Sequence, residues 1–541
     1  KSAAPKDNSA VPKERFAISA APAACANMPI RTAFHVKTLA TLVLVLGGSR
    51  GSLAAVGAID DTCTSTESSS HHEADSDHAG LLQLVREVAE KVDTSTGDMP
   101  VFPWSSSGCD VGYDFCGTME FCGDGASKFG YRLPGIDACE IWTAPLIRMS
   151  PGKRYQMTLR NLASNSVTNV HTHGLHISGD GNADDVTRQV AFGQCLKYNW
   201  DIPVNHMGGT FWYHPHWHHV TLDQVAGGAF GMLIIEEQVD LQQGDAGVQA
   251  WLDNEILLIA SDTGSKLGNG RTGTRFEVIQ NEWYRLRVSA VRPNAVPQDL
   301  TVGSSGATCE TRAVAFDGVW RTSVPDTMPK TRYSLTGSSR IDLAIKCTVV
   351  GEVPIYFAGT NSRSKVATLV VTSGTVTSAT PYIAGQTWAP TRPDYLQDLS
   401  SAAVESFFSI GMTAAQINGQ SWDPEVPLQT FQFGSVQEWT ISASGAHPFH
   451  THLYHMQVME ACGDHEVGQW YDTIAGSGSC RVRFKMIGVG NRMVLHCHVL
   501  SHEDNGSMVW VDVIGAPGPA VDNKDPYTCG SGPTPSPTLV P

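Results

Sequence analysis

The pattern of apolar and polar residues along the chain predicts short β-strands far more often than helices. From about residue 140 onward, short apolar runs alternate with clusters of Gly, Pro, Asn and Asp. Runs that are rich in β-branched and aromatic residues and bounded by turn residues are typical of strands. Residues 81–92 have the apolar spacing of one short amphipathic helix. The sequence therefore predicts an all-β fold.

The predicted strands fall into three groups along the chain. The first group comprises 155–161, 209–216 and 230–237; the second 255–262, 283–291, 340–347 and 365–372; the third 438–444, 455–460, 480–488 and 508–514. Each group has enough strands for one two-layered sandwich. We therefore expect three consecutive β-sandwich domains, at residues 101–240, 250–375 and 395–517.

The rest of the chain is expected to have no core of its own. Within residues 1–58 a signal peptide is predicted from Met28, where basic residues, a short apolar run and small residues follow one another. The alternative for this run is a buried apolar strand. Residues 59–100 are expected to form a polar linker with the short helix, and the Pro- and Ser-rich residues 518–541 a flexible tail.

Charge and composition restrict the partners of the protein. The chain has 541 residues, and its 53 acidic and 37 basic residues give a formal net charge of -16. That charge repels nucleic acids and anionic membranes, so we expect neither as a partner. The apolar run at 38–46 is too short to span a bilayer. We therefore expect no membrane span, and the predicted signal peptide indicates a secreted protein. We also expect a monomer.

The chain contains 13 cysteines, and in a secreted protein most of them are expected to form disulfides. Four of them stand at the start of the first domain and are interpreted as a disulfide-braced lead-in: Cys109, Cys116, Cys122 and Cys139. Cys462 could pair with Cys480, and Cys309 with Cys347. These two pairings are guesses from position along the chain.

Histidine is distributed unevenly. Of the 20 histidines, all but four in the N-terminal region lie within residues 171–219 or 447–502, so the middle domain has none. Four dense motifs stand out: HTHG (His171, His173), HPH (His214, His216), HPFHTH (His447, His450, His452) and HCHVLSH (His496, Cys497, His498, His502). On a strand, residues i and i+2 share a face, so each His-x-His pair can offer two imidazoles to one metal cluster.

A single His-x-His pair is weak evidence, but the HCHVLSH motif is more specific. On a strand His496 and His498 would face one side and Cys497 the other, so one tripeptide would join two metal sites. A thiolate with two imidazoles, available from His447 and His502, is the donor set of a blue copper centre. Zinc is the competing metal, but no second cysteine accompanies Cys497 and a single zinc ion would not use so many histidines.

These four motifs, in this order, resemble those of the multicopper oxidases, the family of laccases, ferroxidases, bilirubin oxidases and bacterial cuprous oxidases. The resemblance covers about residues 130–515. It implies three cupredoxin-type Greek-key β-sandwich domains and an oxidoreductase that uses O₂ as electron acceptor. It also implies four copper ions: one type 1, one type 2 and a type 3 pair.

The resemblance assigns the ligands residue by residue. Type 1 copper would be held by His447, Cys497 and His502; type 2 copper by His171 and His450; and the type 3 pair by His173, His214, His216, His452, His496 and His498. A substrate would then give up one electron at the type 1 copper. The tripeptide 496–498 would connect that copper to the cluster at which O₂ is reduced to water.

Reduction of O₂ to water consumes protons, so the cluster needs carboxylates close by. Glu503 matches the proton-donating glutamate of the family. Either Asp184 or Asp185 matches the aspartate that assists the type 2 side, and the sequence leaves open which of them. A solvated loop acid is the alternative for each of the three.

The axial position of the type 1 copper departs from the family pattern. The family has its axial residue, often Met, ten positions after the cysteine, but here that position is Ser507 and Met508 follows it. Either Met508 reaches the copper or the axial site is vacant. A weak or absent axial ligand is one way in which a protein tunes the copper potential. We assign Met508 as the axial ligand.

The sequence does not decide the substrate. We expect a laccase-like oxidase of phenols or other organic reductants. The alternative is a metallo-oxidase of Fe²⁺, Cu⁺ or Mn²⁺, which would need carboxylates near the type 1 copper; Asp464, Glu466 and Asp472 lie on a loop where they could serve either substrate class. The family usually gives the aspartate at position 472 a structural role. A copper-binding or electron-carrier protein without catalysis is an alternative of another class.

Overall fold

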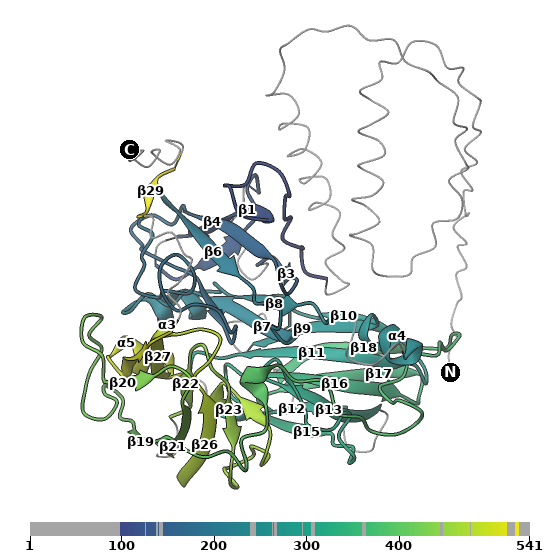
Figure 1. Ribbon diagram of the computed structural model, residues 1–541. Coiled ribbons are helices and arrows are strands. Elements are labelled where there is room, and N and C mark those ends of the chain that lie inside the picture. The colour runs from purple at the N-terminus through teal and green to yellow at the C-terminus, as the bar shows by residue number, and fades with distance from the viewer. Residues whose placement is uncertain are drawn as a thin grey trace, which may run out of the picture. The chain divides into compact units, whose positions relative to one another are not determined.

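The computed structural model describes residues 98–124, 126–136, 139, 144–238, 245–261, 263, 268–294, 296–303, 309–359, 364–443, 447–475, 478–516 and 525–529. The predicted signal peptide, the predicted helix at 81–92 and most of the polar linker lie outside these residues. The described part consists mainly of strands, which form six sheets in three pairs (Figure 1). None of its helices is long and apolar enough to cross a bilayer.

The first sandwich has a five-stranded and a four-stranded sheet. In spatial order the strands of the larger sheet are β2 (Phe129–Arg132), β1 (Phe115–Gly123), β4 (Arg154–Asn161), β6 (Gln194–Asp201) and β29 (Tyr527–Thr528). Those of the smaller sheet are β3 (Ile147–Met149), β8 (Gly231–Ile235), β7 (Gly209–His214) and β5 (His171–His173). A short helix, α3 (Thr221–Ala226), separates β7 from β8.

The second sandwich has two five-stranded sheets. The first sheet runs β14 (Val319–Trp320), β13 (Cys309–Phe316), β16 (Arg340–Cys347), β11 (Trp283–Val291) and β9 (Glu255–Ser261). The second runs β10 (Arg275–Ile279), β18 (Lys365–Thr372), β17 (Gly351–Phe357), β12 (Gln298–Val302) and β15 (Arg332–Leu335). Helix α4 (Ala246–Leu252) precedes it, and Asp245 caps this helix by accepting hydrogen bonds from Gly247 N and Val248 N.

The third sandwich repeats this arrangement. One sheet runs β19 (Ser406–Gly411), β21 (Val436–Ala443), β26 (Gly478–Lys485), β23 (Met456–Val458) and β24 (Trp470–Tyr471). The other runs β20 (Gln429–Gln432), β28 (Met508–Ile514), β27 (Asn491–Cys497), β22 (Phe449–Thr451) and β25 (Thr473–Ile474). The one-turn helix η3 (Asp394–Leu396) precedes this domain, and α5 (Leu500–Asp504) connects β27 to β28.

The three sandwiches share one arrangement of parallel and antiparallel strand pairs, which the sequence did not reveal. In each domain the first sheet contains one parallel pair, namely β1 with β4, β9 with β11, or β19 with β21. The second sheet also contains one parallel pair, namely β3 with β8, β10 with β18, or β20 with β28. Because the pattern recurs in all three, strands of different domains can be compared position by position.

Alternating burial explains why these segments form strands. In β26, Cys480, Val482 and Phe484 are buried, whereas the residues between them are partly exposed. This alternation is what a strand with one face in the core produces. In β16, seven of eight positions are buried, because the face opposite the core packs on another domain. The all-β prediction and the three strand groups are confirmed.

The C-terminal segment does not behave as predicted. Residues 525–529 return to the first sandwich, where β29 pairs with β6 and Cys529 forms a disulfide with Cys195. The expectation of a flexible tail throughout 518–541 is therefore wrong for these five residues. The prediction failed because the Pro- and Ser-rich composition around them obscured one short strand and its cysteine.

The remaining disulfides agree with the sequence analysis. The lead-in is braced by Cys109–Cys116 and Cys122–Cys139. The pairs Cys309–Cys347 and Cys462–Cys480 are also present. Among the described cysteines only Cys497 is free, and it is buried.

Candidate metal centre

Three side chains of the third sandwich converge on one another at the end of β27. The Cys497 sulfur lies 3.4 Å from His447 Nδ1 and 3.5 Å from His502 Nδ1. The thiol is buried, whereas both imidazoles are half-buried. Burial raises the pKa of Cys497 to about 12, so its thiolate would form here only beside a bound cation. A thiolate with two imidazoles near the surface fits copper.

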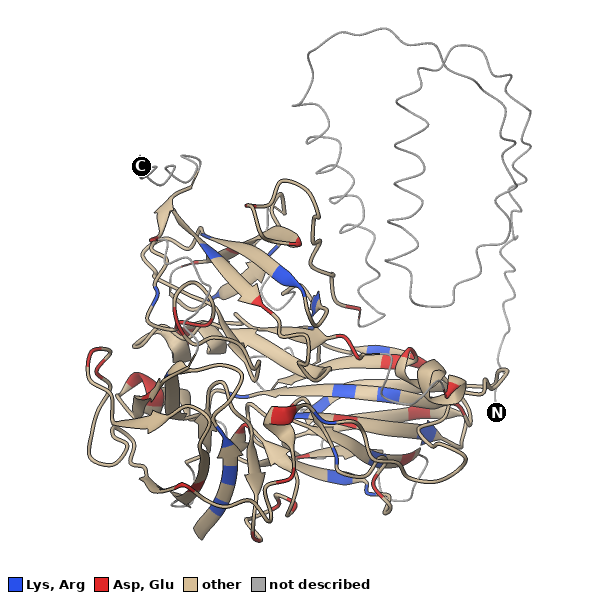
Figure 2. Cartoon of the chain, viewed as in Figure 1, with Lys and Arg blue, Asp and Glu red and all other residues tan. Residues whose placement is uncertain are grey.

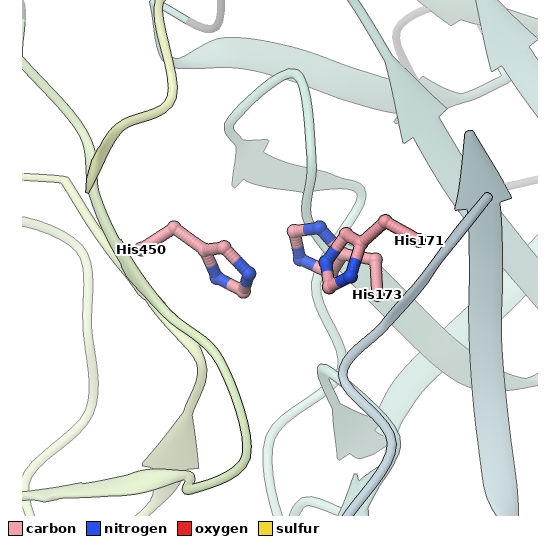
Figure 3. Close-up of side chains that lie close together, drawn as sticks. All are labelled: His171, His173 and His450. Atoms are coloured by element: carbon pink, nitrogen blue, oxygen red, sulfur yellow. The ribbon is translucent and has the colours of Figure 1, made fainter. Parts of the chain in front are cut away.

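A second group of eight histidines lies between the first and third sandwiches. All eight are buried: His171, His173, His214, His216, His450, His452, His496 and His498. β5 and β7 and the residues just after β7 supply the first four, and β22 and β27 and the residues just after each of them supply the others. Figure 3 shows the rings of His171 and His173 pointing toward His450 from the opposite domain.

The rings approach closely enough to share metal ions. His171 stacks on His452 with ring centroids 3.9 Å apart, and His173 stacks on His450 at 3.8 Å. Nε2 of His216 and Nε2 of His496 face each other at 3.2 Å. Sets whose nitrogens lie within 4.8 Å of one another include His171, His173 and His450; His171, His216 and His452; His173, His214 and His498; and His450, His452 and His496.

The ring nitrogens show which sides of these imidazoles are available. The cluster nitrogens that are buried without a hydrogen-bond partner among the described residues are His171 Nε2, His173 Nδ1, His214 Nε2, His216 Nδ1, His450 Nε2, His452 Nε2 and both nitrogens of His498. On four of these rings the other nitrogen is held by oxygen: His171 Nδ1 by Asp184 at 2.7 Å, His173 Nε2 by Asp472 at 3.3 Å, His214 Nδ1 by Pro215 O at 2.9 Å and His450 Nδ1 by Asp472 O at 2.9 Å. One nitrogen fixed by oxygen and the other unpartnered is the arrangement of metal-binding histidines.

Electrostatics keeps these imidazoles neutral, as metal ligands must be. Burial and the neighbouring imidazoles lower the pKa of His171 and His452 well below the usual 6.5. Burial lowers the pKa of His496 to about 3. An uncharged imidazole has a lone pair to donate, so the cluster is prepared for cations without first losing protons.

The sequence HCH links the two groups of ligands. His496 is paired with His450 in the ladder between β27 and β22, and its ring belongs to the histidine cluster. Cys497, the next residue, points to the opposite face of the strand and meets His447 and His502. His498 follows the end of the strand and returns to the cluster, with its ring 5.2 Å from that of His496. Two sites are thus separated by one covalent tripeptide.

Of the two candidate aspartates, Asp184 contacts the cluster. Its Oδ2 lies 2.7 Å from His171 Nδ1, and its Oδ1 accepts hydrogen bonds from Thr172 N at 2.7 Å and Thr172 Oγ1 at 3.0 Å. Asp185 turns the other way, where it accepts from Thr187 and lies near Arg188. Burial raises the pKa of Asp184 well above its usual range.

Glu503 lies on another side of the cluster. Its fully buried carboxylate is 3.1 Å from His496 Nδ1 and 3.4 Å from His216 Nδ1. These are the rings whose Nε2 atoms face each other. Burial raises the pKa of Glu503 above 4.5, and the proximity of His216 partly opposes that rise.

Met508 does not lie where it was expected. It stands opposite His496 in the ladder between β27 and β28, so its side chain shares the face of His496 and not that of Cys497. Its buried side chain packs with Val186 and Val494. Ser507 lies beside Cys497, whose N–H donates to Ser507 O at 3.0 Å. The assignment of Met508 as an axial ligand is therefore wrong, because one residue of register moves a side chain to the other face.

The three loop carboxylates considered for substrate binding have other surroundings. Asp472 is buried against the cluster. Glu466 forms ion pairs with Arg321 and with Lys330, the latter at 2.9 Å. Asp464 is exposed. The contact of Asp472 with His173 joins distant parts of the chain, and nothing in the local sequence predicts it.

Two β-sandwiches that enclose a buried imidazole cluster, beside a Cys-His₂ site in one of them, define a copper protein of the cupredoxin type. Models of the multicopper oxidase family match residues 139–240 and 388–516. The FET3 iron transport multicopper oxidase of Candida albicans is 31% identical over 125 residues, which is 23% of this chain and 18% of that protein. The multicopper oxidase mco of Staphylococcus epidermidis is 23% identical over 68% of this chain and 81% of its own length.

Solved structures show the same fold. A multicopper oxidase of Campylobacter jejuni, described as a metallo-oxidase, superimposes with a TM-score of 0.60 at 19% identity, covering 77% of this chain and 94% of its own. A multi-copper oxidase of Pediococcus acidilactici superimposes with a TM-score of 0.61 at 19% identity, covering 77% of this chain and 90% of its own. In sequence, the chain matches only about a fifth of the FET3 proteins of Candida albicans and Gibberella zeae, 18% and 20% of their lengths. The two matched regions are thus multicopper oxidase domains, and the chain has the fold of solved multicopper oxidases.

Proposed function

We propose that the protein couples the one-electron oxidation of a small reducing substrate to the four-electron reduction of O₂ to water. The observation on which this rests is the tripeptide 496–498, which joins the Cys-His₂ site near the surface to the buried histidine cluster. An electron carrier needs only the first site. The second site buries eight imidazoles from two domains. Burial of so many polar groups costs folding free energy, which a catalysed reaction would explain.

The donors fit four copper ions. His447, Cys497 and His502 would hold the type 1 copper; His171 and His450 the type 2 copper; and His173, His214, His216, His452, His496 and His498 the type 3 pair. The mutual proximity of His173, His214 and His498 supports one half of that pair, and the facing Nε2 atoms of His216 and His496 support the other. Bound copper would supply the one-electron chemistry at the first site and the reduction of O₂ at the second.

The protein itself would orient the ligands and supply protons. Asp184 accepts the Nδ1 proton of His171, which leaves Nε2 free to bind metal. Glu503 has no solvent contact and lies against the Nδ1 atoms of His216 and His496. Because burial raises its pKa, its carboxyl oxygen can hold a proton and release it toward the cluster.

We propose an organic reductant such as a phenol as the substrate. The segment 413–422 contacts residues 505–507, which lie beside His502. The contacts are hydrogen bonds from Ser507 Oγ to Thr413 O and from Trp422 N to Gly506 O. This segment contains no Asp or Glu. Asp472 is buried and Glu466 is already paired with cations. A site for Fe²⁺ would need free carboxylates near the type 1 ligands.

A metallo-oxidase is the second candidate. It is favoured by the relatives named as iron transport multicopper oxidases and by the Campylobacter structure described as a metallo-oxidase. Secretion is part of the proposal, because five disulfides among the described cysteines are expected in an oxidising compartment. The monomeric state stays a prediction.

One experiment tests the function. O₂ consumption by the copper-loaded protein is measured with a phenol and with Fe²⁺, alongside the visible spectrum and a Cys497→Ser control. The expected result is intense blue absorption and O₂ uptake with the phenol, both lost in the control. Faster uptake with Fe²⁺ would select the metallo-oxidase. Blue colour without uptake from either donor would leave a copper carrier.

A further inference from the structure

A buried arginine of the second sandwich reaches the histidine cluster. Arg340, the first residue of β16, is fully buried, and its guanidinium forms two hydrogen bonds with the carboxylate of Asp472, one of them from Nη1 to Oδ1 at 3.0 Å. The guanidinium also donates to Asp317 O at 2.9 Å, Ser338 O at 3.0 Å and Thr210 O at 3.3 Å. Its position is therefore determined on every side.

Asp472 connects that arginine to imidazoles from both of the other domains. Its Oδ1 lies 3.3 Å from Nε2 of His173 in the first sandwich. Its main-chain oxygen lies 2.9 Å from Nδ1 of His450 in the third. The two rings stack on each other, so Asp472 contacts one ring nitrogen of each member of this stacked pair.

The chain is built closely around this ion pair. Gly174 follows His173 with φ of 91°, and a Cβ atom there would lie 2.4 Å from Arg340 Nη2 and 2.7 Å from Asp472 Oδ2. No side chain fits at that distance. The glycine of the HTHG motif therefore allows the first sandwich to approach the arginine of the second.

We propose that Arg340 is a positioning residue of the trinuclear site. By holding the carboxylate of Asp472 through two parallel hydrogen bonds, it fixes the ring orientation and the tautomer of His173, and it anchors the residue whose main-chain oxygen meets His450. The second sandwich has no histidine, and through this residue it would act on the metal centre. The inference rests on the proposed function, because it concerns the ligands of the type 2 and type 3 copper ions.

Loss of the bidentate pair would free the Asp472 carboxylate to rotate, and His173 would lose its fixed partner, whereas the main-chain oxygen of Asp472 would stay beside His450. Groups that orient metal-binding histidines typically change metal affinity or activity by about 10–100-fold when they are replaced. None of the hydrogen bonds or ion pairs of Arg340 in the described residues involves His447, Cys497 or His502. The effect should therefore fall on the cluster and spare the type 1 site.

The test uses two replacements of Arg340 and one control. Arg340→Gln removes the charge, and Arg340→Lys keeps the charge but not the fork that binds a carboxylate with two parallel hydrogen bonds. Arg285→Lys is the matched control: Arg285 is also fully buried on the neighbouring strand β11, and it pairs with Asp342 and Glu237 instead of a group that contacts histidine. The readouts are copper per chain, the type 2 electron paramagnetic resonance signal, the type 1 absorption and the melting temperature of the copper-free proteins.

We expect Arg340→Lys to lower the affinity of the histidine cluster for copper by about 10–100-fold and to alter the resonance signal, with the type 1 absorption unchanged. Arg285→Lys should keep both signals. A wild-type resonance signal and affinity in Arg340→Lys, or an equal loss in Arg285→Lys, would overturn the inference. If Arg340→Gln does not fold, Arg340→Lys decides the question. Failure of the proposed function would look different, because the wild-type protein itself would then show no O₂ uptake.

Discussion

The contrast between Asp184 and Asp185 allows a sharp test of the type 2 side. Replacement of Asp184 by Asn keeps the size of the side chain and an oxygen that can still accept from Thr172 N. The new amide nitrogen would face Nδ1 of His171, where the carboxylate oxygen now lies at 2.7 Å. Two N–H groups would then point at each other. The imidazole would either move or change its tautomer, and the second response would place a proton on the Nε2 atom that is free for metal.

The magnitude follows from the hydrogen bond that is lost. A buried polar group that is left without its hydrogen-bond partner costs about 1–3 kcal/mol, and each 1.4 kcal/mol corresponds to a tenfold change in an equilibrium constant. Asp184→Asn should thus weaken type 2 copper binding by about 10–100-fold. Asp185→Asn should leave that affinity unchanged, because Asp185 contacts Thr187 and Arg188 instead of a ligand.

The assay is dialysis of each copper-loaded variant against a graded series of chelator, followed by the type 2 resonance signal and the type 1 absorption. In Asp184→Asn the type 2 signal should disappear at a lower chelator concentration than in wild type, while the blue absorption persists. Equal loss in Asp185→Asn would refute the assignment. Parallel loss of the type 2 resonance signal and the type 1 absorption in Asp184→Asn would show that the residue stabilises the fold and does not act on one ligand.

Three further predictions concern other parts of the molecule. Glu503→Gln should slow O₂ reduction by about 10²–10⁴-fold in stopped-flow turnover with the type 1 absorption intact, and wild-type turnover would exclude Glu503 as the proton donor. Met508→Leu should leave the visible spectrum and the type 1 potential unchanged, because its side chain faces away from Cys497; a shifted band would restore it as an axial ligand. Replacement of both Cys195 and Cys529 by Ser opens a loop of sequence separation 334. It should lower the free energy of unfolding, measured by urea titration, by at most about 6 kcal/mol. An unchanged midpoint would contradict a stabilising role for β29.

The sequence was sufficient for the features that depend on short-range order. Strand groups follow from runs of apolar residues, and the ligand motifs follow from the two-residue period of a strand. His496, Cys497 and His498 could be interpreted without a structure, because neighbouring residues on a strand must point to opposite faces. The same local logic separated the histidine-free middle domain from its neighbours.

Features that depend on register or on distant segments could not be predicted. Met508 was assigned by counting residues from Cys497, but the ladder between β27 and β28 places it opposite His496. The choice between Asp184 and Asp185 depends on how one loop folds over His171. The contact between Arg340 and Asp472 joins residues 132 positions apart, and no local pattern indicates it.

The repeated topology explains how the cluster is built and where its symmetry ends. β5 pairs with β7 in the first sandwich as β22 pairs with β27 in the third, and the registers place His171 opposite His214 and His450 opposite His496. His171 is thus equivalent to His450, and His173 to His452. The stacked pairs across the interface, His171 with His452 and His173 with His450, exchange these equivalents as a two-fold axis would.

The acidic residues break this symmetry. Nδ1 of His171 meets the side chain of Asp184, whereas the equivalent Nδ1 of His450 meets the main-chain oxygen of Asp472. Glu503 lies beside His496, whereas among the described residues the equivalent His214 has a main-chain oxygen, that of Pro215, as the hydrogen-bond partner of its Nδ1. Because the ligands are paired by the approximate symmetry and the carboxylates are not, protons should enter the cluster from defined sides. The second sandwich has strands equivalent to β5 and β7 in β12 and β17, but these lack histidine; its contacts with the cluster's surroundings include those of Arg340 and Asp317 with Asp472.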